Sequence, residues 1–96
     1  MVIRSSTPPT VEVDSDALAA YVRFRRTKVA RTVTRPSRTC HVAVDLDRSG
    51  EVVGIEIIGA RVIQIGKILE QAAVRAPQVD FSKVRYIPAG MAAQSA

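Results

Sequence analysis

The sequence has no tryptophan, a single cysteine and few aromatic residues, which make up 4% of its 96 residues. The single cysteine, Cys40, cannot form an internal disulfide and cannot supply a cysteine-rich zinc site. No apolar run approaches the roughly 20 residues that span a bilayer, and the opening MVIRSSTPPT lacks the apolar core of a secretory signal. The sequence therefore predicts a cytoplasmic protein with no membrane partner.

Hydrophobic residues make up 47% of the chain, which supports one modest core in a chain too short for two. We expect a single domain over residues 10–88. The adjacent Pro8 and Pro9 lack backbone donors and disfavour helix, so residues 1–9 are predicted to form a flexible tail. Residues 89–96 are predicted to form a second flexible tail.

Positive charge is concentrated in one part of the chain. The formal net charge is +5, and the stretch from residue 23 to residue 38 contains no Asp or Glu. Its basic residues are Arg23, Arg25, Arg26, Lys28, Arg31, Arg35 and Arg38. The next stretch is rich in acidic residues, namely Asp45, Asp47, Glu51 and Glu56. This division predicts separate basic and acidic surfaces.

Alternation of apolar and polar residues predicts an antiparallel sheet. We expect a four-stranded β-meander, with strands at residues 17–26, 28–35, 40–46 and 51–58. The segment TVEV at residues 10–13 is left open as a further strand, and a short extended segment is expected within residues 79–90.

After Gly59 the apolar period becomes helical, which predicts a helix over residues 64–75 packed on one face of the sheet. The fold class is therefore a small α+β domain with a helix after its sheet. The predicted core consists of Val22, Phe24, Val42, Val44, Leu46, Val53, Ile55, Ile57, Ile65 and Leu69.

One acidic motif has the spacing of a calcium-binding EF-hand loop, through Asp45, Asp47, Ser49, Gly50 and Glu56. An EF-hand needs a helix on each side of its loop, whereas both flanks here alternate with period two. We therefore reject the metal site and interpret the stretch from 47 to 50, DRSG, as a hairpin turn closed by a left-handed glycine. Asp45 and Glu56 could face each other across this hairpin as a carboxylate pair, but surface acids in turns are common and no acid–base partner is specified.

Catalytic chemistry has little support in the sequence. His41 is the only histidine, and its neighbour Cys40 is expected to point to the opposite face of a strand, which argues against a Cys–His dyad. Cys40 is interpreted as a small core residue. We predict no catalytic residue, no cofactor and no small-molecule substrate.

Three segments in order, VDSDALAAYVRF, KVARTV and HVAVDLDRSGEVVGIEIIGA, resemble the small bacterial proteins grouped as domain-of-unknown-function family 2283. The resemblance covers Val13 to Ala60. It implies a small antiparallel sheet followed by a helix, and no established activity, cofactor or catalytic residue. Members are also similar to small partners encoded beside toxin-like proteins, which implies an antitoxin-like or other interaction role.

The chain departs from the family pattern where members commonly carry acidic residues. Leu18 stands at one such position, the turn after the AYVR strand reads RRTK, and the stretch after Val33 reads TRPSR. If members contact a basic partner through those acids, this chain lacks that surface and is suited to an acidic one instead.

Two functional hypotheses follow. The first is a non-enzymatic protein-interaction module whose sheet face or edge docks another chain or a second copy as a homodimer. The alternative is nucleic-acid binding through a basic β-hairpin from Arg23 to Arg38. The same arginines are also consistent with a solvated face that has no binding role. Its contact residues would be Tyr21, Arg23, Arg25, Arg26, Lys28, Arg31, Arg35 and Arg38.

Overall fold

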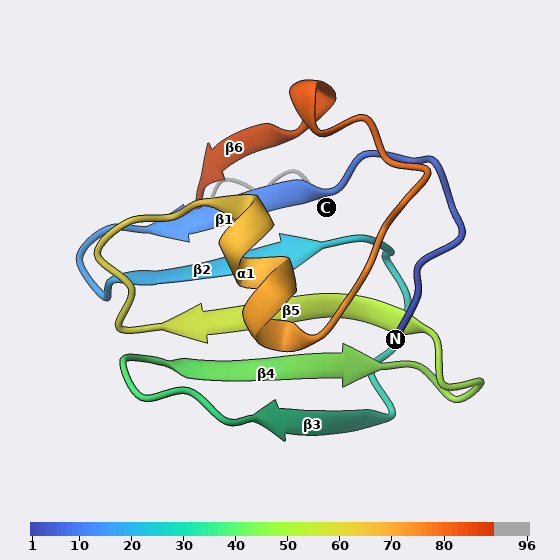
Figure 1. The fold of residues 1–96 in the computed structure, drawn as a ribbon, viewed down its shortest axis with the longest axis horizontal. Coiled ribbons are helices and arrows are strands. Elements are labelled where there is room, and N and C mark those ends of the chain that lie inside the picture. The colour runs from blue at the N-terminus through green and yellow to red at the C-terminus, as the bar shows by residue number, and fades with distance from the viewer. Residues whose placement is uncertain (90–96) are drawn as a thin grey trace.

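The computed structural model describes residues 1–89, which form one mixed sheet with a helix on one face (Figure 1). The six strands lie in the order β3-β4-β5-β2-β1-β6. All neighbouring strands are antiparallel except β1 and β6, which are parallel. The elements are β1 (Thr10–Asp14), β2 (Ala19–Arg23), β3 (Arg31–Arg35), β4 (His41–Leu46), β5 (Val52–Ile58), α1 (Ile65–Ala72), the 3-10 turn η1 (Phe81–Lys83) and β6 (Arg85–Pro88).

The α+β class is confirmed, but the expected meander is wrong. β3, β4 and β5 follow one another as hairpin-connected strands, whereas β2 lies beside β5 and not beside β3. This is a Greek-key arrangement, in which residues 24–30 carry the chain past the ends of β5 and β4. The segment TVEV, left open above, forms most of β1 and pairs with both β2 and β6.

The burial of charge explains why β2 does not pair with β3. Val22 of β2 lies opposite Ile55 of β5, and both side chains are fully buried. In a meander β3 would be an inner strand, and Arg31 and Arg35 would lose water without acidic partners. At the edge of the sheet, Arg31 stays exposed. In addition, the turn RRTK lacks the glycine or asparagine that a tight hairpin needs.

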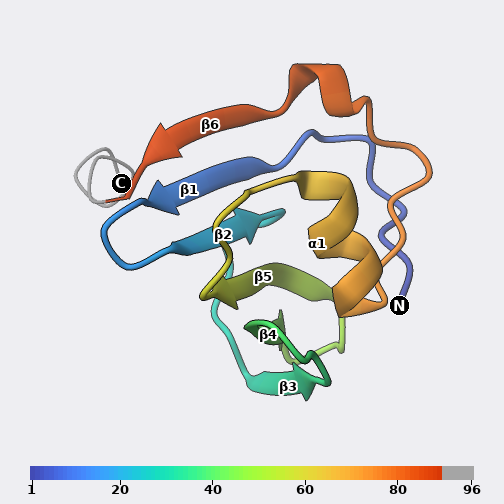
Figure 2. The same ribbon diagram turned by 60° about the vertical axis from the view of Figure 1, so that its left-hand side comes forward.

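The core lies between the sheet and the segments that cover one of its faces. Figure 2 shows α1 on that side of the sheet, which we call the helix face. α1 contributes Ile68, Leu69 and Ala72, and it contacts β4 and β5. The segment after the helix adds three further buried residues, Val74, Ala76 and Val79. The short helix therefore covers only part of the helix face, and the segment that follows it completes the core.

Most of the predicted core is confirmed. Val22, Phe24, Val42, Val44, Leu46, Ile55, Ile57 and Leu69 all belong to the buried cluster. Val53 is fully buried but lies outside that cluster, next to the irregularity at which β5 slips against β4. Ile65 is only partly buried because it begins α1, and Ile68, one turn later, occupies the buried position instead.

Both ends of the described chain depart from the expected tails. Ile3 is buried in the core cluster, and its N–H donates to the Arg75 carbonyl at 2.7 Å, so the first residues lie against the domain. At the other end, Ala89 donates to the Val13 carbonyl at 2.8 Å. The rest of the expected C-terminal tail, residues 90–96, lies outside the described residues.

α1 ends three residues earlier than predicted, at Ala72. Ala73 takes the left-handed conformation (φ 56°), and the N–H groups of Ala73 and Val74 return to the carbonyls of Glu70 and Leu69. These paired bonds form a Schellman-type cap, a motif that usually places glycine where Ala73 stands. The chain then leaves the helix toward the N-terminal segment.

Candidate functional site

The sheet face opposite α1, which we call the open face, carries a polar network centred on Tyr21. The Tyr21 ring lies over Gly54 of β5, where an added Cβ would overlap the ring. From there its hydroxyl donates to Asp45 of β4 at 2.7 Å, and Thr32 of β3 donates to the same carboxylate at 2.6 Å. Burial, followed by the hydrogen bond and charge of Asp45, raises the pKa of Tyr21 above its ordinary value.

On the same face, Arg23 extends the network from β2 toward β1. Its guanidinium lies 4.9 Å from the centre of the Tyr21 ring and donates two hydrogen bonds to Glu12 of β1, at 3.0 and 3.3 Å. Glu12, Arg23, Tyr21, Asp45 and Thr32 thus form a chain from β1 to β3. Within residues 1–89 no buried side-chain N or O atom lacks a hydrogen-bond partner. The buried polar atoms of this network therefore have partners within the described chain.

Asp47, the central carboxylate of the EF-hand-like motif, is held by the predicted hairpin turn. Asp47 accepts hydrogen bonds from the Ser49 N–H, the Ser49 hydroxyl and the Glu51 N–H, and Gly50 is left-handed (φ 86°). The Ser49 hydroxyl is the main cause of the lowered pKa of Asp47. This spacing of Asp, Ser and Gly is thus explained by the turn.

Asp45 and Glu56 do not form a carboxylate pair. Asp45 lies opposite Gly54, and Glu56 lies opposite Ala43, because the strand register sets the two acids on different rungs. Glu56 lies 3.5 Å from His41 Nε2, whereas Asp45 binds Tyr21 and Thr32. Within residues 1–89 no group of three metal-ligating side chains comes together.

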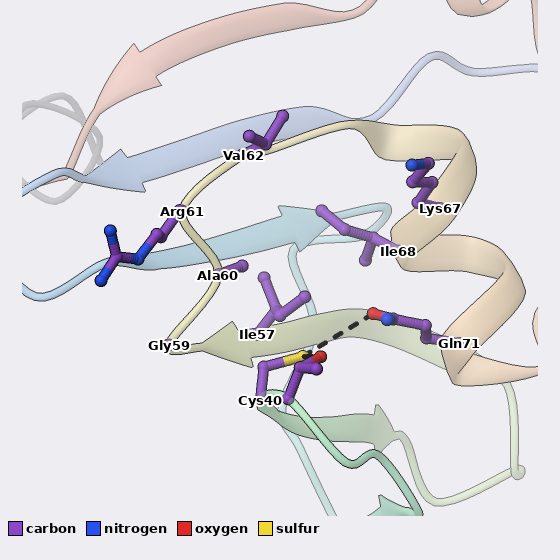
Figure 3. A pocket seen from close by; sticks show the side chains of 10 residues that line it. Cys40, Ile57, Gly59, Ala60, Arg61, Val62, Lys67, Ile68 and Gln71 are labelled. Carbon is purple, nitrogen blue, oxygen red and sulfur yellow. Dashed lines mark hydrogen bonds between the residues drawn. The ribbon is translucent and has the colours of Figure 1, made fainter.

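Cys40 lines a cleft of about 360 Å³ between the sheet, the connection after β5 and one side of α1 (Figure 3). Its thiol lies 3.8 Å from the Gln71 side-chain oxygen and 3.3 Å from the Ser37 hydroxyl. His41 lies on the open face with Glu56, so the prediction that these neighbours point to opposite faces is confirmed. The cleft thus holds a thiol without an imidazole to activate it.

The basic residues predicted to form one hairpin are divided between two distant strands. Tyr21 and Arg23 belong to β2, whereas Arg31 and Arg35 belong to β3, with β5 and β4 between them. The basic β-hairpin from Arg23 to Arg38 therefore does not form. The remaining members, Arg25, Arg26, Lys28 and Arg38, lie exposed in the connections around β3.

Several of these side chains already serve the fold. Arg23 binds Glu12, and Arg25 forms an ion pair with Asp47 at 2.7 Å, which fixes the crossing segment to the β4–β5 turn. Arg35 Nε donates to the Ala72 carbonyl at 2.9 Å, at the carboxyl end of α1. Because the last turn of α1 contains no basic residue, Arg35 supplies the cation that favours a helix C-terminus.

What remains is the outer edge of the sheet, formed by β3 and flanked by Lys28 and Arg38, which we call the basic edge. β3 pairs with β4 alone and ends the sheet. Arg31, Thr32 and Thr34 are exposed, and Val33 is half-buried. In such a strand alternate backbone N–H and C=O groups point away from the sheet, where another strand can pair with them.

The opposite edge of the sheet is less suited to pairing. β6 is shorter than β3 and contains Pro88, which has no N–H to donate. Figures 1 and 2 show β3 and β6 at the two ends of the sheet. The basic edge is therefore the stronger candidate for docking another chain.

The family model described as "Protein of unknown function (DUF2283)" matches residues 10–61, more than half of the chain. The chain belongs to this family. The match spans β1 to β5, including the Greek key and the polar network, and ends before α1. Searches of curated proteins and of solved structures found no match. In the described residues 1–89, no helix is long and apolar enough to cross a membrane.

Sequence reasoning missed Glu12 and the role of Gly54. A signal for Gly54 was available, since an isolated glycine in a strand often marks a close approach of another group. Glu12 could have been found from the alternation of TVEV, which places it on the face opposite Val11. The choice of Asp45 as the partner of Tyr21 depends on β2 lying beside β5, which no local pattern reveals.

Proposed function

We propose that this protein is a non-enzymatic interaction module that docks an extended segment of a partner protein along the basic edge. The observation that carries the proposal is the one-sided pairing of β3, whose other side is free of any strand within residues 1–89. Strand addition to a sheet edge gains main-chain hydrogen bonds, and side-chain contacts then select the partner.

The polar network of the open face supports the edge over that face. Its charged residues bind one another, so a partner docked there would have to displace formed hydrogen bonds, such as that between Tyr21 and Asp45. The exposed Thr32 and Thr34 on β3 suit strand pairing, because β-branched residues favour extended backbone. Docking along β3 leaves the core and the network intact.

The proposal places the module in the cytoplasm, where a lone cysteine stays reduced, and an antitoxin-like inhibitor of a second protein is one form it would take. Nucleic-acid binding, the alternative, loses two of its supports. The basic hairpin is not formed, and Tyr21, the residue expected to stack on a base, lies over Gly54 and binds Asp45.

A library of random peptides tests the proposal without assuming a partner. Peptides that bind the immobilised protein are selected, and their binding site is mapped by chemical-shift changes in the amide spectrum. We expect binders whose largest shifts fall on residues 31–35. Binders that map to the open face or to α1, or a selection that yields none, would contradict the proposal.

A further inference from the structure

We infer that the segment docked on β3 is acidic, with carboxylates four residues apart on either side of an apolar residue. This inference rests on the proposed function and names the chemistry of its partner. By alternation, Arg31, Val33 and Arg35 share one face of β3, and Val33 packs against the core cluster. An added strand would set an apolar side chain beside Val33 and acidic ones beside the two arginines.

The charged side chains of β3 itself and of the connections that flank it are of one sign. Residues 23–38 contain no Asp or Glu, and the exposed Lys28 and Arg38 stand beyond the two ends of β3. No ion pair within residues 1–89 involves Arg31. Arg35 donates its Nε to the Ala72 carbonyl, which leaves the terminal N–H groups of its guanidinium for another acceptor.

Two acids of the adjacent strand and its turn, Asp45 and Asp47, form no ion pair with Arg31 or Arg35. Asp45 lies opposite Thr32 but points to the open face, where Thr32 and Tyr21 bind it. Asp47 is held by Arg25 and by its own turn. No ion pair within residues 1–89 involves Arg31 or Arg35, so a carboxylate on an incoming strand would not have to displace one.

A second copy of this chain is a poor occupant of the same edge. The sequence of β3, RTVTR, is a palindrome, so antiparallel pairing of two copies about Val33 would set valine beside valine and threonine beside threonine. The same register sets Arg31 of each copy beside Arg35 of the other, and like charges directly opposite are destabilising. Glutamate or aspartate at those two places converts the repulsion into attraction.

A nucleic acid would neutralise the positive charge of the basic edge but would not pair with all the free backbone groups of β3. Its phosphates accept hydrogen bonds, whereas the free groups along β3 include carbonyls as well as N–H donors. An extended peptide supplies both partners. The observations therefore favour an acidic peptide segment over a nucleic acid.

Three capped peptides of about nine residues, long enough to overhang β3 at both ends, test the inference. They share a central valine flanked by threonines and carry glutamate, glutamine or lysine at the two positions that meet Arg31 and Arg35. Affinity is measured by titration from low to physiological salt. We expect the glutamate peptide to bind about tenfold more tightly than the glutamine peptide at low salt, with the difference shrinking as salt rises.

Charge reversal at Arg31 supplies the matched test. Arg31→Glu should weaken the glutamate peptide about tenfold and strengthen the lysine peptide, whereas Arg61→Glu, an equal charge change at an exposed site between β5 and α1, should change neither. The amide spectrum verifies that each variant is folded, and Lys28→Glu replaces Arg31→Glu if the latter is not.

Each contrary result has a separate meaning. Equal binding of the glutamate and glutamine peptides on β3 would overturn the acidic inference and leave the proposed function standing. Failure of all three peptides, together with an empty random selection, would overturn both. If a DNA or RNA oligonucleotide binds more tightly and displaces the glutamate peptide, the inference of a peptide partner is wrong and the basic edge binds nucleic acid instead.

Discussion

The ring of Tyr21 lies over Gly54 and reaches across β5 to donate its hydroxyl to Asp45 of β4. The glycine leaves a gap in the side-chain layer of the open face, and the aromatic ring fills it. Because the ring comes from β2 and the carboxylate from β4, the contact joins the two parts of the Greek key that the sequence separates.

Substitution Gly54→Ala is expected to destabilise the protein by about 1–3 kcal/mol, because the new methyl group occupies the space of the Tyr21 ring and displaces it from Asp45. Gly66→Ala, in α1, is the matched control. Apart from its chain neighbours and its own helix backbone, no atom lies within 4 Å of its added Cβ, and alanine should stabilise the helix by about 0.5–1 kcal/mol. Urea unfolding of both variants measures the difference; equal stabilities would refute the close packing.

Tyr21 should make the protein less stable at alkaline pH. Its folded-state pKa is raised, so its contribution to stability is complete below the ordinary value of about 10 and is lost as pH rises above it. In a Tyr86→Phe background the phenolate absorbance reports Tyr21 alone, and Asp45→Asn should lower its pKa. Unfolding from about pH 8 to about pH 11 should show a loss that Tyr21→Phe reduces; titration of Tyr21 at or below the ordinary value would contradict the network.

Arg35 is expected to be a structural residue. Arg35→Ala removes the hydrogen bond to the Ala72 carbonyl and the cation at the end of α1, and should cost about 1–2 kcal/mol. Arg38→Ala, an equal change at an exposed site, should stay within about 0.5 kcal/mol of the parent. Thermal or urea unfolding compares the two. If both variants have the same stability, Arg35 does not cap the helix.

Ala73→Gly is expected to stabilise the protein by about 0.5–1 kcal/mol, because Ala73 is left-handed and glycine adopts that conformation without a Cβ penalty. Ala72, one residue earlier, is fully buried and helical, so Ala72→Gly should destabilise the protein instead. The opposite signs are read from urea midpoints. A loss of stability in Ala73→Gly would argue against the Schellman-type cap.

The β4–β5 hairpin could be predicted from the sequence because its information is local. Two alternating runs flank Asp47 and Gly50, and the turn chemistry requires the residue types found there. The position of β2 could not be predicted in the same way. Its alternation shows that it is a strand, but the choice between β3 and β5 depends on the total burial of charge across the sheet.

The candidate site likewise has features that the local sequence predicts and features that depend on contacts distant in sequence. The stretch of positive charge was visible in the sequence, and so was the idea that an edge could dock another chain. Which arginines serve the fold was not visible, because Arg23 binds Glu12 and Arg35 binds the Ala72 carbonyl through contacts distant in sequence. The basic surface of the folded protein is therefore a strand edge with flanking cations and not a hairpin.

Hydrogen exchange of the β3 amides, measured by NMR with and without a bound peptide from the random selection, tests the account most directly. In the free protein alternate amides of Arg31–Arg35 point away from β4 and should exchange quickly, whereas their neighbours are protected by pairing. Strand addition predicts that the fast amides become protected while those of β6 do not change. Binding that leaves the β3 pattern unaltered would contradict docking at the basic edge.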